Sequence, residues 1–183
     1  HWNRKFAVDE AIDVTVYDSF IRGKPTWLHQ LESDPNLTVI KHDIRDPLPD
    51  DMGHFAYIIH GASIASPIYY RKHPLETMDA NVGGLRRLVD YALEQSELDS
   101  PVEGFLFYSS SEIYGDPTPE NIPTPEEYRG NVSCTGPRAC YDESKRYGET
   151  LCVTVAQQYD LPTRMARPFN NYGPGLKISD RRA

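Results

Sequence analysis

A tyrosine and a lysine four residues apart are the side chains of this sequence with the clearest capacity for chemistry. Tyr141 and Lys145 lie in a segment with helical periodicity, so they project from one helix face and can meet at one bound substrate. A phenol, with its pKa of ~10, acts as a base near neutral pH when a nearby cation stabilises its phenolate. The same spacing is also typical of an amphipathic helix with a half-buried tyrosine and a solvated lysine.

Hydroxyl and carboxylate side chains follow the apolar run that precedes this helix. Ser109–Ser111 and Glu112 come directly after Gly104–Tyr108. The carboxyl ends of parallel strands are where open α/β sheets bind ligands. The alternative is a strand-end turn whose serine hydroxyls bond the backbone, followed by a solvated acid. The nearby Tyr141 and Lys145 favour a site in which hydroxyl, phenol and ammonium converge.

Asp18 is the candidate cofactor contact. It ends a β-branched run, at the place where a carboxylate accepts hydrogen bonds from the adenosine ribose of NAD. A carboxylate there repels a 2′-phosphate and favours NAD over NADP, although Arg22 and Lys24 nearby leave NADP open. The alternative is an aspartate that opens a turn. Asp43-Ile44, after the next run, is a second pair of this kind.

The glycine-rich fingerprint that normally precedes such an aspartate is absent. No GxGxxG or GxxGxxG occurs, and the GxG at Gly173–Gly175 lies far downstream. The fingerprint normally lies about 20 residues before the acid, which here falls before residue 1. The sequence also opens on His1 without an initiator methionine. We therefore expect a fragment that lacks the first strand and the glycine loop.

The rest of the sequence predicts alternating strands and helices, which indicates a parallel sheet. The expected strands are Val14–Tyr17, Leu37–Ile40, Phe55–Ile59, Gly104–Tyr108 and Thr163–Ala166. The expected helices begin near Pro74 and Ala139 and end near Glu97 and Tyr159. The predicted fold is α/β, a Rossmann-like doubly wound parallel sheet.

Each predicted helix has a face that should be buried. The apolar stripe of the first is formed by Leu75, Met78, Val82, Leu85, Val89 and Ala92. The small-residue face of the second is formed by Ser144, Gly148, Leu151, Cys152 and Val155. Between the helices, the proline- and glutamate-rich stretch Pro117–Arg129 predicts a surface loop near a site.

Composition narrows the classes of protein. The 183 residues carry a net charge of −8 with 39% hydrophobic content, and no apolar run approaches the length of a membrane span. The acidic balance argues against nucleic acid or a membrane surface as the main partner. Three cysteines without CxxC spacing predict reduced thiols, no metal site and a cytoplasmic location.

Several stretches resemble the extended short-chain dehydrogenase/reductases that act on nucleotide sugars, the NAD-dependent epimerase/dehydratase family. The resemblance covers almost the whole chain. The stretches that carry it are Val16–Phe20, His42–Asp46, His60–Pro67, Asn81–Gly84, Ser110–Pro117, Gly136–Arg146 and Arg167–Pro174.

The resemblance implies a role for each candidate residue. Tyr141 and Lys145 would be the catalytic YxxxK pair, and Ser110 the partner hydroxyl. Glu112 would be an additional acid/base, and Asn170 would contact the substrate together with Ser110 and Glu112. The implied NAD contacts are Asp18, Asp43, Ile44, Ala62, Tyr141, Lys145 and Pro168.

Within the family, the sequence most resembles the branch that decarboxylates UDP-glucuronate through a 4-keto intermediate. Ser111 stands where dTDP-glucose 4,6-dehydratases carry an acidic Asp, and a simple 4-epimerase needs no carboxylate at Glu112. GDP-mannose 4,6-dehydratases have a similar order but use NADP. Gly61 departs from the leucine usual in the decarboxylases. A 4,6-dehydratase, a 4-epimerase and a non-catalytic dinucleotide- or nucleotide-sugar-binding fragment stay as alternatives.

The resemblance also implies the organisation of the chain. Residues 1–170 would form an N-terminally incomplete NAD-binding domain, and residues 171–183 would begin a truncated substrate-binding region. The implied partners are a nucleotide-sugar substrate and a second copy of the chain, paired through the two long helices.

Overall fold

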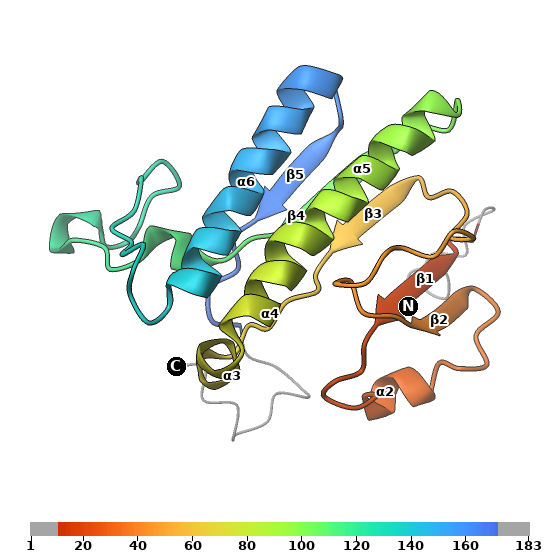
Figure 1. The fold of residues 1–183 in the computed structure, drawn as a ribbon, viewed down its shortest axis with the longest axis horizontal. Helices are drawn as coiled ribbons and strands as arrows, with labels where there is room; N and C mark the ends of the chain where they lie inside the picture. The colour runs from red at the N-terminus through yellow and green to blue at the C-terminus, as the bar shows by residue number, and fades with distance from the viewer. Residues whose placement is uncertain (1–10, 172–183) are drawn as a thin grey trace. The chain divides into compact units, whose positions relative to one another are not determined.

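The computed structural model describes residues 11–171 of the chain. The chain divides between Asp46 and Pro47 into two compact units, which are described separately. Both units contain parallel strands joined by helices or turns, as Figure 1 shows. Within this described part, none of the helices has the length and apolar character that crossing a bilayer would need.

The first unit is built on two parallel strands. Strand β1 (Val14–Asp18) pairs with β2 (Leu37–Lys41), and the short helix α2 (Thr26–His29) lies between them in sequence. Val14 is opposite Leu37 and Asp18 is opposite Lys41. No residue of either strand is fully buried. The two strands alone therefore enclose no apolar core.

The second unit contains a three-stranded parallel sheet in the order β3-β4-β5. The strands are β3 (Tyr57–His60), β4 (Gly104–Tyr108) and β5 (Thr163–Ala166). Its helical elements are α3 (Pro67–Lys72), α4 (Pro74–Met78), the π-helical turn η1 (Asp79–Gly83), α5 (Gly84–Glu97), the 3-10 turns η2 (Ser111–Tyr114) and η3 (Pro119–Asn121), and α6 (Ala139–Tyr159).

Helices α5 and α6 lie side by side over one face of this sheet, as Figure 1 shows. Phe105 and Phe107 of β4 point toward these helices and are almost fully buried. Tyr57 and Ile59 of β3 alternate with buried residues and are 66% and 64% exposed. The core of the unit therefore lies between the helices and one face of the sheet.

Close packing of α6 on β4 depends on the small residues that the sequence pattern identified. All five members of the predicted small-residue face are buried, which confirms that prediction. A Cβ added to Gly148 would lie 2.3 Å from Cζ of Phe107. Only a residue without a side chain allows the helix to approach the sheet this closely.

The predicted stripe of the first long helix is wrong at its N-terminal end. Leu75 and Met78 are 71% and 43% exposed, whereas Thr77 and Asn81 are fully buried. The cause is η1, because a π-helical turn holds more residues than an α-helical one and shifts the phase of the helix before it. Leu85 and later positions keep the predicted face.

Most strand predictions agree with the structure to within a residue or two, and the α/β class is confirmed. All pairings in the two sheets, β1-β2 and β3-β4-β5, are parallel, as they are in a doubly wound sheet. The predicted boundary at residue 170 stays a prediction, and Gly173–Gly175 lie outside the described residues.

Candidate active site

The first two turns of α6 carry the tyrosine and lysine of the predicted pair. Tyr141 is 6% exposed and Lys145 is 2% exposed, so neither is a surface residue. The Tyr141 ring stacks on Tyr70 of α3, with centroids 5.1 Å apart and planes at 14°. This stacking fixes the phenol ring of Tyr141.

Lys145 is buried beside the end of strand β4. Its Nζ donates a 2.7 Å hydrogen bond to the carbonyl oxygen of Tyr108 and lies 5.7 Å from the Tyr141 ring centroid. Burial lowers the pKa of Lys145 to about 8. The structure therefore excludes the solvated lysine of the simple amphipathic helix and places an ammonium group against the phenol ring.

Ser110 and Glu112 occupy the turn that follows β4. Ser110 is buried and its Oγ accepts a 3.2 Å hydrogen bond from the Glu112 backbone, so this serine caps η2. The backbone of Ser111 donates to the carbonyl of Pro168 at 3.1 Å. These bonds hold the turn that carries the candidate acid/base against the segment after β5.

An arginine that the sequence analysis gave no role joins this turn to α6. Arg138 forms an ion pair with Glu112, and its Nε lies 3.5 Å from a carboxylate oxygen of Asp142. Asp142 is 6% exposed, and burial raises its pKa. In the sequence, only the charged residues of the stretch Gly136–Arg146 indicated that such a contact could form.

Asn81 is a second residue that the sequence analysis left without a role. Its amide nitrogen donates a 2.8 Å hydrogen bond to the Ser144 hydroxyl, which in turn donates to the carbonyl of Tyr141 at 2.8 Å. All three residues are buried. The π-helical turn thus supports the first turn of α6 through a relay of two hydrogen bonds.

Polar atoms without partners gather near the carboxyl ends of β3 and β4. His60 ends β3, and burial, aided by the nearby charge of Lys145, lowers its pKa to about 4. Nε2 of His60 and the hydroxyl oxygens of Ser63 and Ser109 are buried and accept or donate no hydrogen bond among the described residues. Such atoms at this edge of a parallel sheet indicate that a ligand completes their bonding.

Two further predicted site residues lie at or after the ends of strands in the first unit. Asp18 is exposed at the end of β1, and its carboxylate accepts a 2.6 Å hydrogen bond from the Phe20 backbone. Asp43 follows β2 and accepts two side-chain hydrogen bonds from Arg45, which lower its pKa. Asp18 therefore ends a parallel strand and Asp43 follows one, as expected, and each also orders its own turn.

The other predicted contacts follow the strands of the second unit or the end of β2. Ala62 is exposed after β3, Ile44 is partly buried after β2, and Pro168 and Asn170 lie after β5. Pro168 contacts η2 through its carbonyl. For the residues of the second unit, the structure thus brings the ends of all three strands of its sheet into the candidate site.

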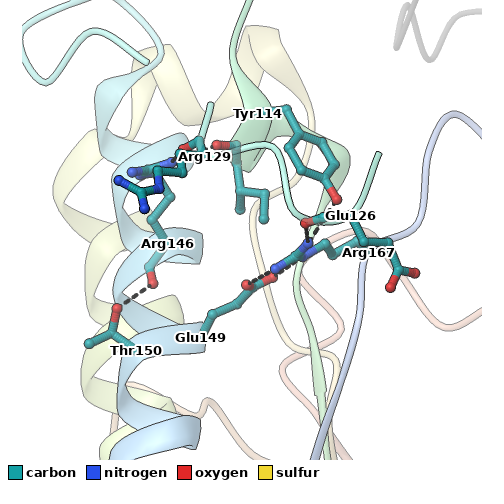
Figure 2. Close-up of polar contacts among 8 residues, drawn as sticks. Tyr114, Glu126, Arg129, Arg146, Glu149, Thr150 and Arg167 are labelled. Atoms are coloured by element: carbon teal, nitrogen blue, oxygen red, sulfur yellow. Dashed lines mark hydrogen bonds and ion pairs between the residues drawn. The ribbon is translucent and has the colours of Figure 1, made fainter. Parts of the chain in front are cut away.

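A separate polar network, drawn in Figure 2, joins η2 to α6 and to Arg167, which follows β5. Arg146 donates through Nη1 to the carbonyls of Ile113 and Arg129, at 2.8 and 2.9 Å. Arg167 donates twice to Glu149, at 2.8 and 2.6 Å, and once to the Tyr114 hydroxyl at 2.8 Å. The paired carboxylate raises the pKa of Arg167 further above its ordinary range.

The fold and the buried YxxxK pair define a class of dinucleotide-dependent α/β proteins. A model described as "NAD dependent epimerase/dehydratase family" matches residues 5–183, and the chain belongs to that family.

Curated relatives with decarboxylase names match the chain. UDP-glucuronic acid decarboxylase 3 of Arabidopsis thaliana is 36% identical over 182 residues, which cover 100% of this chain and 50% of the relative. UDP-glucuronic acid decarboxylase 1 of Xenopus tropicalis is 37% identical over 170 residues, which cover 93% of this chain and 38% of the relative. The chain thus spans half or less of the length of these relatives.

Solved structures share the fold. The dTDP-glucose 4,6-dehydratase DesIV of Streptomyces venezuelae, solved with NAD bound, gives a TM-score of 0.71 at 24% identity, covering 91% of this chain and 49% of that one. The UDP-glucose 4-epimerase of Thermus thermophilus, in complex with NAD, gives a TM-score of 0.68 at 22% identity, covering 90% of this chain and 49% of that one.

Proposed function

We propose that this chain carries the catalytic residues of an NAD-dependent UDP-glucuronate decarboxylase. The observation that carries the proposal is the buried Lys145 ammonium against the Tyr141 ring. The ion pair of Arg138, at the start of the same helix, with Glu112 adds to it. Relatives 36% identical over the full chain bear that enzyme's name, which favours this reaction over others of the family.

The residues of the chain fit a dinucleotide. The unpartnered hydroxyls of Ser63 and Ser109 and the exposed turn at Ala62 offer donors and open backbone at a sheet edge that binds ligands in this fold class. We expect NAD to be held by Asp18, Asp43, Ile44, Ala62, Tyr141, Lys145 and Pro168. When bound, NAD supplies a hydride acceptor that later returns the hydride.

Tyr141 acts as the base on the sugar 4-hydroxyl. The charge of Lys145 stabilises the phenolate, and the Ser110 hydroxyl bonds the same sugar oxygen. Oxidation at C4 leaves the C5 carboxylate β to a ketone, and such an acid loses carbon dioxide readily. Glu112 then delivers a proton to C5, and Tyr141 returns its proton to the 4-oxygen as the alcohol is restored.

The reaction is tested by the mass of the product. The full-length protein is incubated with NAD and, separately, UDP-glucuronate, dTDP-glucose and UDP-glucose. We expect loss of one carbon dioxide from UDP-glucuronate. Loss of one water from dTDP-glucose would instead identify a dehydratase, and conversion of UDP-glucose to an isomer of the same mass would identify an epimerase. Binding of NAD without turnover of any substrate would leave a binding module.

The proposed assembly is a homodimer that pairs α5 and α6 with a second copy. Exposed aromatic residues on α6, Tyr147 and Tyr159, support this surface. Light scattering on the full-length protein tests it, and a monomer at micromolar concentration would contradict it.

A further inference from the structure

Arg138 stands in an unusual place for a cation. It is the N-cap residue of α6, a helix of 21 residues, and its side chain makes no capping hydrogen bond. Ser, Thr, Asp and Asn are preferred at this position, and a positive charge opposes the positive end of the helix dipole. The arginine therefore adds nothing to the start of the helix, and its contacts must account for it.

Those contacts are two carboxylates from different elements. Glu112 on η2 pairs with the guanidinium, and Asp142 on the next turn of α6 lies 3.5 Å from Nε. Asp142 is buried, and its Oδ1 has no hydrogen-bond partner among the described residues. Asp142 thus attracts the Nε side of the guanidinium, while Nη2 pairs with Glu112. The Glu112 side chain is 32% exposed.

The other groups around Arg138 add to its electrostatic role. Asp116, after η2, and Glu143, on α6, both act on Asp142 as like charges. Tyr70 of α3 lies close enough for Arg138 to act on its phenol. Arg71 of α3 also acts on this phenol, whereas Arg138 pairs with both Glu112 and Asp142. Removal of Arg138 would therefore take from both carboxyl groups the cation that they share.

We propose that Arg138 is a positioning residue that orients the Glu112 carboxyl group for its proton transfer to the sugar ring. The inference rests on the proposed function, in which Glu112 exchanges a proton with the sugar ring. Arg138 does not itself touch the reacting atoms. It sets the direction of the residue that does, from the turn of α6 that also carries Tyr141.

Five variants of the full-length protein test the proposal. Arg138→Met removes the charge but keeps the aliphatic length, and Arg138→Lys restores the charge without the planar fork. Glu112→Gln removes the partner carboxylate, alone and combined with Arg138→Met. Lys72→Ala, an exposed cation at the end of α3, is the control for the loss of one positive charge.

Turnover of whichever nucleotide sugar reacts is measured across about pH 5.5 to about pH 8.5. We expect Arg138→Met to lower kcat ~10- to 100-fold with little change in KM. It should also move the basic limb of the profile, where Glu112 loses the proton that it delivers, to higher pH, because the carboxyl group has lost its cationic partner. Arg138→Lys should recover part of both effects. In the Glu112→Gln background, Arg138→Met should change kcat less than about twofold. An undiminished effect in that background, or an unmoved basic limb, would overturn the proposal.

A second readout separates this inference from the proposed reaction. If no substrate turns over, the proposed function fails, and the Arg138 and Glu112 variants are compared by urea unfolding. The contact predicts that Arg138→Met shifts the unfolding midpoint less when Glu112 is already Gln. Additive shifts would refute the contact, whatever the enzyme does.

Discussion

The polar groups near the two faces of helix α6 differ in how completely they are hydrogen-bonded. The inward face carries Tyr141 and Lys145, close to buried atoms of His60 and Ser109 that have no partner among the described residues. The outward face, shown in Figure 2, carries Arg146 and Glu149.

On the outward face, the charged groups meet one another. Glu149 accepts two hydrogen bonds from Arg167, and Arg146 bonds two backbone carbonyls of the loop around η2. A buried polar atom left without a partner costs about 1–3 kcal/mol. Incomplete bonding on the inward face therefore indicates a place for a ligand, and complete bonding on the outward face indicates a structural support.

Tyr141→Phe is the strongest way to test this difference. It removes one inward hydroxyl, so we expect turnover to fall by ~10² to 10⁴, the usual contribution of general acid/base catalysis. The unfolding midpoint should hardly change, because the stacking on Tyr70 is kept. Steady-state kinetics and urea unfolding on the same sample make the comparison. Intact turnover would show that the inward face is not the catalytic one.

Glu149→Gln tests the outward face. It weakens the bidentate pair with Arg167, whose side chain is 29% exposed, and we expect a loss of about 2 kcal/mol in unfolding free energy. Turnover per folded molecule should fall less than about threefold. Asp90→Asn is the matched control, because it breaks the exposed pair with Arg86 and should cost less than about 1 kcal/mol. Equal losses in the two variants would remove the distinction between the networks.

The sequence was sufficient to place Tyr141 and Lys145 on one face of a helix and to locate the strands. Tyr141 and Lys145 are recognisable because their spacing is local and follows the helical period. The small-residue face around Gly148 is recognisable for the same reason. These features depend on residues within one element.

The contacts of Arg138, Asn81 and Arg167 could not be predicted from the spacing of residues within one element. Each joins elements far apart in sequence, as in the bond between Asn81 and Ser144. The misplaced stripe at Leu75 has a related cause, since nothing local marks the π-helical turn that shifts it. Sequence periodicity shows which residues share a face, and the tertiary structure decides what that face meets.

Gly148→Ala tests how closely the inward face is packed. The added Cβ would lie 2.3 Å from Phe107 and 3.2 Å from Leu85, so overpacking should cost about 1–2 kcal/mol after the better helix propensity of alanine is counted. Gly83→Ala is the control, because its Cβ would approach only the mobile end of Arg87, at 3.2 Å. Urea unfolding measures both. A Gly148→Ala protein as stable as the control would mean that α6 lies further from β4 than the structure shows.

The smallest effect that we expect concerns His60 on the inward side of the site. Its pKa is about 4 in the folded protein and about 6.5 in an unfolded chain, so the unfolded state binds the extra proton first as pH falls. Stability is therefore complete above about pH 6.5, declines below it, and the loss levels off below about pH 4. Lowering the pH from about 7 to about 5.5 should therefore reduce the free energy of unfolding by about 1 kcal/mol through this histidine. Urea unfolding at the two pH values should show this decline in the wild type and in His73→Asn, an exposed histidine, but less of it in His60→Asn. If all three proteins lose the same stability, His60 is not held neutral by burial, and the inward face is more open to water than its unpartnered atoms indicate.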